Sequence, residues 1–272
     1  MYTEFDKRMK RYERQFNVAL DPNEPVIVRV DGRCFHTFTK NFQKPFDDVL
    51  SRTMRDTMQY LCENVQGCVL GYTQSDEISL LLANYLNERA EPFFGYRVQK
   101  LCSVIASMAT AAFLDRYEAN VEDYENEFDE LFERYYKHKY VTFDCRAFNI
   151  PKEEVTNYFY WRQSDAFRNA VNMIARTHYS DKQLKNKSRD EVIGMLHEKN
   201  DYLSNYESHH LLGSCCIKKK VPLIKTAPTL EQSVFTRDKW FIDLEIPAFK
   251  KEGREYIEKL IRQNGEGSIT TK

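Results

Sequence analysis

Two short acidic stretches interrupt otherwise apolar segments of the sequence. Asp31 and Gly32 end a β-branched run, and Asp76 and Glu77 divide an apolar run that extends from residue 68 to residue 83. Two carboxylates brought together repel each other unless a cation lies between them. Carboxylate oxygens and a backbone carbonyl at Gly32 suit Mg²⁺, which keeps waters and binds phosphate oxygens. The pattern predicts a metal site, with ordinary turn residues as the structural alternative.

Two Mg²⁺ ions about 3.5–4 Å apart would activate a hydroxyl and stabilise a leaving phosphate. The residues that follow Gly32 are expected to form a turn into a helix, whose amide N–H groups would bind a triphosphate: Arg33, Cys34, Phe35 and His36. Three bases are expected on elements that converge on the same strand ends: Lys44, Arg97 and Lys100. The combined pattern indicates phosphoryl transfer.

The acidic stretches need a sheet to bring them together. Residues 26–30 are predicted to form a strand, residues 46–65 a helix, and residues 68–83 a hairpin whose bend holds the two acids. A helix from residue 98 and a strand within 139–151 follow. This β-α-β-β-α-β order predicts an α+β fold, with a ferredoxin-like antiparallel sheet and helices on one face.

The remaining segments are expected to add helices and strands. Residues 1–17, 152–176 and 188–200 read as helices, the last with Ser188 as N-cap and Glu191 three residues later. A β segment is expected at 211–224, a loop around Pro228, a strand near 240–246 and a helix from about 251. We expect a catalytic domain at 1–150, a helical part at 151–220 and an extension of unknown role at 221–272, possibly as one compact unit.

Charge is unevenly distributed along the 272 residues, although the formal net charge is −1. Residues 118–133, expected to form an exposed helix, hold eight of the 41 acids and no base, which leaves 33 acids against 40 bases elsewhere. A polyanionic partner is compatible with this excess, as is a solvated basic face. The seven cysteines without C-x-x-C spacing, and an N-terminus without the apolar centre of a signal peptide, predict a cytoplasmic protein with reduced thiols and no membrane segment.

Several motifs, in a fixed order over about residues 5–220, resemble the tRNA-His guanylyltransferase superfamily. They are "VRVDGRCFHTF", "NFQKPFDD" and "GYTQSDEISLLL", followed by "FDCRAF", "YFYWRQSDAFRNAV" and "MLHEKND". The resemblance implies a palm-like catalytic domain that works in the 3′-to-5′ direction and adds nucleotides to the 5′ end of tRNA. It also implies a homotetramer.

By this resemblance Asp31, the Gly32 carbonyl and Asp76 would hold two Mg²⁺ ions, with Glu77 as support. Residues 31–36 and Ser75 would bind the nucleotide. Further family positions that serve triphosphates or the tRNA end are matched by these residues: Lys44, Arg97, Lys100, Asn169, Lys199 and Asn200. In the implied chemistry ATP or GTP activates a 5′-monophosphate, the 3′-hydroxyl of an incoming nucleotide attacks it, and pyrophosphate then leaves the new terminus.

Where the eukaryotic pattern reads W-R-Q-x-D-C-H-I-N-N, this chain has "WRQSDAFRNA", so that Phe167 replaces the His and Ala170 the second Asn. The first change resembles the guanylyltransferase-like branch, which repairs truncated 5′ ends by templated addition. Fixed addition of a −1 G to tRNA-His is the alternative. Cys145 also stands where the family has Gly, and nothing in the sequence explains it.

Other interpretations involve different classes of protein. A palm-type nucleotide cyclase or dinucleotide synthase would share the fold and the carboxylates, and an RNA-binding protein without catalysis would not need the acids. The aromatic run Phe159, Tyr160 and Trp161 is expected to pack in the core rather than stack on bases, with Arg162 and Asp165 at the surface. The pairs at 209–210 and 215–216 are expected to be loop histidines and a buried strand rather than a metal site.

Overall fold

The computed structural model describes residues 3–87, 90–123, 132–136, 140–226 and 232–262. Its strands are β1 (Val26–Gly32), β2 (Cys68–Gln74), β3 (Glu77–Leu82), β4 (Phe143–Asn149), β5 (Ser214–Thr226) and β6 (Gln232–Asp243). The larger helices are α1 (Glu4–Glu13), α3 (Asp48–Asn64), α4 (Val98–Glu122), α6 (Val155–Ala175) and α8 (Arg189–Glu198). The shorter ones are α2 (Phe35–Phe38), α7 (Asp181–Leu184), α9 (Ser208–Leu212) and α10 (Glu255–Glu258). Short 3₁₀ turns lie at Arg14–Phe16, Asn84–Leu86, Phe93–Tyr96, Lys152–Glu154, Leu203–Asn205 and Lys251–Arg254, and a π turn at Phe132–Tyr136.

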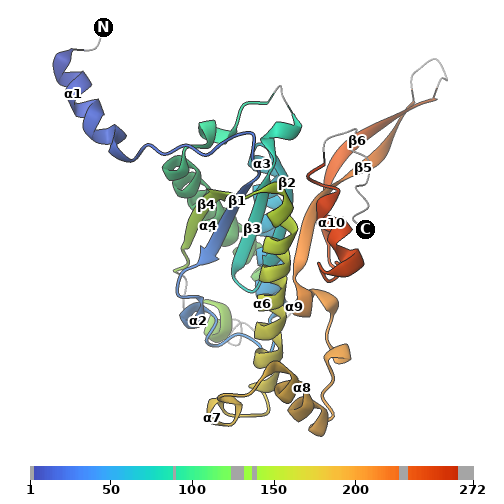
Figure 1. The fold of residues 1–272 in the computed structure, drawn as a ribbon. Coiled ribbons are helices and arrows are strands. Elements are labelled where there is room, and N and C mark those ends of the chain that lie inside the picture. The colour runs from blue at the N-terminus through green and yellow to red at the C-terminus, as the bar shows by residue number, and fades with distance from the viewer. Residues whose placement is uncertain (1–2, 88–89, 124–131, 137–139, 227–231, 263–272) are drawn as a thin grey trace.

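The strands form one six-stranded sheet in the order β4-β1-β3-β2-β5-β6, and every pair is antiparallel. The first four strands with α3 and α4 have the β-α-β-β-α-β order and the split arrangement of a ferredoxin-like core. The predicted α+β class and antiparallel sheet are therefore confirmed. In Figure 1 the strands are spread across the view, from β4 and β1 on the left to the β5–β6 hairpin on the right.

The alternation of residues along β1 divides the core into two layers. Val26, Val28 and Val30 contribute to a cluster that includes residues of α3 and α4, whereas Ile27 contributes to a second cluster with Phe159 of α6. The helices of the β-α-β-β-α-β unit thus lie on one face of the sheet, as expected. The additional helix α6 covers the other face (Figure 1).

Helix α4 is long and apolar enough to cross a membrane by length and composition alone. Its residues Leu101, Ile105, Ala109 and Phe113 are, however, fully buried in the first cluster. It is therefore accounted for as the core helix of the sheet. Half of the acidic helix predicted for 118–133, residues 124–131, lies outside the described residues, and residues 118–122 form the end of α4.

The C-terminal half extends the sheet. Strand β5 pairs with β2, and the β5–β6 ladder runs from Cys215 opposite Asp243 to Thr226 opposite Gln232, so that the hairpin projects from the body (Figure 1). Two boundaries differ from the sequence prediction, since α9 occupies residues 211–212 and β6 begins at Gln232. The predicted loop at Pro228 lies outside the described residues. The proposed division into 1–150, 151–220 and 221–272 stays a prediction, and β5 crosses its second boundary.

Candidate active site at the paired ends of β1 and β3

The bend between β2 and β3 contains two residues, Ser75 and Asp76. Ser75 has a φ of +50°, in the left-handed region that tight hairpin turns require. Its hydroxyl donates a hydrogen bond of 3.1 Å to the Asp76 carboxylate. Glu77 is the first residue of β3, so the two adjacent acids belong to different elements: one to the turn and one to the ladder.

The end of β1 lies beside this turn. Asp31 is the register partner of Glu77 on β3 and of Asp144 on β4, and the Gly32 N–H donates a hydrogen bond of 3.0 Å to the Asp76 carbonyl. The expected placement of Asp31 and Asp76 at neighbouring strand ends is therefore confirmed. Their role as metal ligands stays a prediction.

Gly32 has a steric reason to be glycine. A Cβ at this position would lie 2.3 Å from the Phe35 ring, which is buried against Phe38, Phe113 and Phe143. The backbone at the end of β1 can therefore pass over the aromatic core only without a side chain. This close approach fixes the position of the end of β1, including Asp31 and Gly32, relative to the aromatic core.

Burial raises the pKa of Asp76 above its usual range. The hydrogen bond from Ser75 lowers it, whereas the negative charges of Asp31 and Glu77 raise it further. Among the described residues no group of three or more His, Cys, Asp or Glu side chains is arranged to hold a metal ion. Two carboxylates and a carbonyl nevertheless form an oxygen-only donor set that leaves positions for water and phosphate, which fits Mg²⁺.

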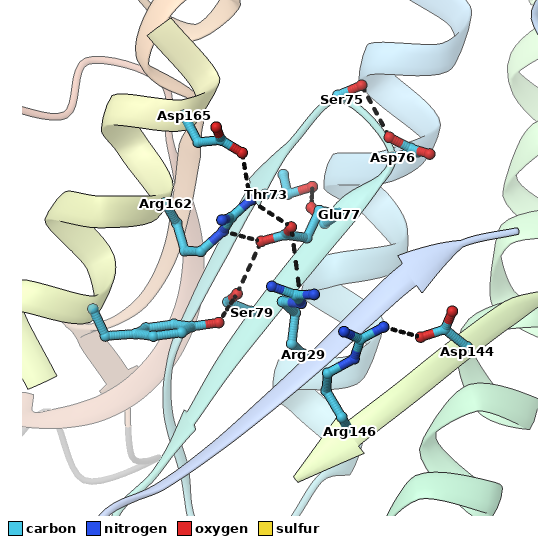
Figure 2. A network of polar contacts seen from close by, with 11 residues as sticks. Arg29, Thr73, Ser75, Asp76, Glu77, Ser79, Asp144, Arg146, Arg162 and Asp165 are labelled. Carbon is cyan, nitrogen blue, oxygen red and sulfur yellow. Dashed lines mark hydrogen bonds and ion pairs between the residues drawn. The ribbon is translucent and has the colours of Figure 1, made fainter. Parts of the chain in front are cut away.

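Glu77 already has a protein partner. Its side chain is buried, and Arg162 of α6 donates two hydrogen bonds of 2.8 Å to its carboxylate, while Arg29 Nε lies 4.0 Å away (Figure 2). Arg162 also bonds Asp165, and Ser79 beside Glu77 contacts the Tyr158 hydroxyl. Burial raises the pKa of Glu77, and the two arginines oppose this shift.

The prediction that Arg162 lies at the surface was wrong, because the residue is 6% exposed. A buried carboxylate at the start of β3 needs a cation, and α6 provides it from the layer above the sheet. The sequence contained a usable signal, since Val155, Phe159, Arg162 and Ala166 recur at helical spacing and are all buried.

A cavity opens directly beside the turn. It lies between α3, α6 and α9, is partly open to solvent, and has a volume of about 90 Å³ that water can occupy. Its wall includes Gln74 and Ser75 from the hairpin and Asn169 from α6. Two residues predicted to bind nucleotide from separate motifs, Ser75 and Asn169, thus face one space.

The rest of the cavity wall combines apolar and basic groups. Phe46 and Met54 line it together with Arg55, His209 and His210. His210 stacks on Phe46 with ring centroids 4.6 Å apart, and His209 Nδ1 lies 3.1 Å from a Glu207 oxygen without hydrogen-bond geometry. Burial, together with the positive charges of His210 and Arg55, lowers the pKa of His209 to about 4.

Sequence reasoning did not assign Arg55 or the two histidines to the site. Arg55 falls within the α3 pattern, and the histidines are more than 130 residues away from the hairpin in the sequence. Only the tertiary structure brings α9 to β2. The predicted buried strand at Cys215 and Cys216 is confirmed, because both are fully buried in β5, whereas His209 and His210 lie in α9 and not in a loop.

The stretch after Gly32 only partly matches its prediction. Cys34 adopts the left-handed conformation (φ +59°) and is the N-cap of α2, which is four residues long. Arg33 and His36 are exposed, whereas the Phe35 side chain is buried and only its backbone is available to a ligand. Nucleotide binding by residues 31–36 stays a prediction.

Two of the predicted phosphate-binding bases lie elsewhere in this chain. Arg97 bridges to Ala19, and Arg97 and Lys100 line a basic hollow with Lys10 and Arg14, at the end of the sheet where β3 finishes. The expectation that Arg97 and Lys100 converge with Asp76 within one chain was wrong. Asp76 lies where β3 begins, whereas α4 starts beyond the other end of β3, at the opposite end of the sheet.

The other matched polar residues lie nearer to the cavity or to α8. Lys44 precedes the cavity residues Phe46 and Asp47, and its ammonium donates a hydrogen bond to the Thr39 carbonyl. Lys199 and Asn200 follow the C-terminal end of α8 and are not among the residues that line the cavity. Their predicted roles are not decided by this placement.

Comparison with known proteins gives this geometry its context. The family model described as tRNAHis guanylyltransferase matches residues 6–151, the part that carries the carboxylates and the palm-like sheet. The chain belongs to the tRNAHis guanylyltransferase family. This confirms the resemblance seen in the motifs and identifies the chain as a nucleotidyltransferase.

Members of the tRNAHis guanylyltransferase family with known structures extend the likeness to nearly the whole chain. A bacterial guanylyltransferase-like protein in complex with ATP shares 36% identity and a TM-score of 0.80, over 96% of this chain and all of that one. A bacterial guanylyltransferase-like protein in complex with GTP shares 34% identity and a TM-score of 0.70, over 95% of this chain and 99% of that one. A probable tRNA(His) guanylyltransferase of Dictyostelium discoideum is 28% identical over 213 residues, 72% of this chain and 76% of that protein.

Proposed function

We propose that this protein adds nucleotides to the 5′ end of tRNA in the 3′-to-5′ direction, as a templated repair reaction. The observation that supports this most directly is the placement of Asp31 and Asp76 at neighbouring strand ends, joined by the hydrogen bond from the Gly32 N–H to the Asp76 carbonyl, next to the cavity lined by Ser75 and Asn169. Carboxylates at a strand end and an adjoining pocket with polar and apolar walls are what a phosphoryl-transfer site requires.

Asp31, Asp76 and the Gly32 carbonyl would hold two Mg²⁺ ions. When bound, these ions would increase the nucleophilicity of the attacking hydroxyl and stabilise charge on the leaving phosphate. The protein's own contribution is positional, because the Gly32–Asp76 hydrogen bond fixes the two strand ends and Arg162 neutralises Glu77. The negative charge of the site would then be concentrated on Asp31 and Asp76.

The nucleotide would occupy the cavity between α3 and α6. Phe46 and Met54 offer an apolar wall to a base, while Ser75, Asn169 and Arg55 offer hydrogen bonds to its sugar and phosphates. ATP or GTP would activate the 5′-monophosphate, and the 3′-hydroxyl of the incoming nucleotide would then attack it. This use of both nucleotides agrees with the ATP and GTP complexes of the two bacterial relatives.

Two residues favour repair over fixed guanylation. Phe167, which stands where the eukaryotic pattern has His, packs with the apolar cluster around α8 and lies under the Arg189 guanidinium. Ala170 lines the cavity in place of the second Asn. Both changes remove polar groups from the segment of α6 that would recognise the 5′ end of one particular tRNA. The added nucleotide would then be selected by base pairing with the opposite strand of the tRNA.

The test uses α-labelled GTP, unlabelled ATP, Mg²⁺ and a 5′-monophosphorylated tRNA that lacks its first G. Wild type should produce labelled tRNA that is one nucleotide longer. Asp76→Ala should not, whereas Asp115→Ala, a change at an exposed acid of α4, should. Repetition with C or A opposite the added position separates repair from −1 G addition, since only repair depends on that base.

Two outcomes would contradict the proposal. Label in a small cyclic or dinucleotide product, with unchanged tRNA, would assign a nucleotide cyclase or dinucleotide synthase activity to the site. Unchanged turnover in both Asp31→Ala and Asp76→Ala would remove the metal assignment. The homotetramer and the cytoplasmic location stay predictions, to be checked by light scattering and by fractionation of cells.

A further inference from the structure

One flank of α6 faces β4 and carries an exposed tryptophan. Tyr158 contacts Phe148 of β4 and Trp161 of the next helical turn, with ring centroids 5.9 and 6.0 Å apart. Trp161 is 55% exposed, although the sequence predicted it to be in the core. The side chain therefore lies at the edge of the space between α6 and the β1–β4 side of the sheet.

The indole of Trp161 is held in place by the active-site arginine. The Arg162 guanidinium lies 4.4 Å from the Trp161 ring, in cation–π geometry, and the same guanidinium makes two hydrogen bonds to Glu77. Glu77 follows Asp76 and is the register partner of Asp31. One arginine thus separates an exposed aromatic ring from the carboxylate site.

Two exposed cations accompany this ring. Arg168 lies two turns further along α6, about 10 Å from Trp161 along the helix axis. Arg146 lies on β4, two residues before Phe148, and is half exposed. Each pairs with an acid, Asp165 and Asp144, but ion pairs at exposed positions are weak and leave an arginine available to a phosphate. An exposed indole flanked by arginines is the composition of surfaces that bind single-stranded nucleic acid.

We propose that Trp161 is a stacking platform for the terminal base at the 5′ end of the RNA substrate. The proposal rests on the function proposed above and adds to it a residue that positions the RNA end. The incoming nucleotide has its own space, since the cavity is lined by Ala166, Asn169 and Met173 of α6, which lie on a different side of that helix. Stacking at Trp161 would place the 5′-phosphate near Asp31 and Asp76.

The two tryptophans of the chain, Trp161 and Trp240, make a direct test available. Trp240→Phe leaves Trp161 as the single indole, and Trp161→Phe leaves Trp240 on β6 as the matched control. Truncated 5′-monophosphorylated tRNA should quench the fluorescence of Trp240→Phe and leave that of Trp161→Phe unchanged. A tRNA with an abasic first nucleotide should bind without quenching, because no base is present to stack.

Kinetics provide the second measurement. Trp161→Ala should raise the KM for tRNA about tenfold while the KM for GTP stays within twofold, and Trp161→Phe should recover most of the loss because a phenyl ring also stacks. No quenching by tRNA in Trp240→Phe, or quenching by GTP alone, would overturn the proposal. Label transfer into tRNA by Trp240→Phe is scored separately, so that failure of stacking is distinguished from failure of the reaction itself.

Discussion

The buried carboxylate of Glu77 accepts hydrogen bonds from Nε and Nη2 of Arg162, both at 2.8 Å. Asp76, its neighbour in the sequence, accepts one from Ser75 and forms no ion pair within the described part of the chain. The adjacent acids therefore have different tasks. Glu77 fastens α6 to the sheet, and Asp76 keeps a carboxylate whose charge the protein leaves uncompensated.

Arg162→Met should destabilise the protein by about 3–5 kcal/mol, because it leaves a buried carboxylate without its cation. Urea unfolding at pH 7.5 measures the free energy of unfolding. Adding Glu77→Gln to this variant should restore part of the loss, since a neutral amide costs less to bury. Arg168→Met, at an exposed position on the same helix, is the control, and an equal effect there would show that helix composition is responsible.

Gly32→Ala should destabilise the protein by about 1–3 kcal/mol, because its Cβ would overlap the Phe35 ring. Gly194→Ala is the matched change, since a Cβ there meets nothing within 4 Å and the residue lies inside α8. It should stabilise by about 0.5–1 kcal/mol. Thermal unfolding compares the two, and a loss of stability at Gly32 no larger than that of Ala substitutions at exposed loop positions would contradict the close packing of Gly32 on Phe35.

His209 should make the stability depend on pH. Its pKa is lowered to about 4 by burial, with His210 and Arg55 adding to the shift, so the folded protein keeps the ring neutral where the unfolded chain protonates it. The resulting stability is complete above about pH 6.5 and is lost as the pH falls toward 4. Urea midpoints between pH 4.5 and 7.5 should therefore fall more steeply for wild type than for His209→Gln. His197→Gln, at an exposed position, should follow wild type.

Asn169→Ala should raise the KM for the incoming nucleotide about three- to tenfold, the size of one lost hydrogen bond, with little change in kcat. Asn172→Ala lies three residues further along α6, where the amide bonds only the Arg168 carbonyl, and should change neither constant. A larger effect on kcat than on KM at Asn169 would instead assign this residue to the chemical step.

The sequence predicts the sheet and its acidic edge well, for a physical reason. Alternation along residues 26–30 and a two-residue bend at Ser75 and Asp76 are local signals, and a short hairpin leaves little freedom in register. The positions of Asp31 and Asp76 follow from these signals. The capping box at Ser188 and Glu191 was equally local, and both hydrogen bonds are formed.

The rotation of α6 could not be predicted in the same way. General preferences place Trp161 inside and Arg162 outside, and the structure has the reverse. The reason lies 85 residues away in the chain, since a cation must reach Glu77 and the tryptophan one position earlier is then turned outward. Similarly, the cavity histidines depend on the pairing of β5 with β2, which no local pattern encodes.

Arg97 and Lys100 lie at one end of the sheet and Asp76 lies at the other, so the length of β3 separates them. A triphosphate, which is too short to span that strand, would therefore have to contact two molecules of the protein to be held by both sets of charges. Under that arrangement the turnover rate per protein molecule would fall on dilution, because the two molecules would separate. It would rise again when a variant that has intact carboxylates but lacks Arg97 and Lys100 is mixed with a variant that has these bases but lacks the carboxylates.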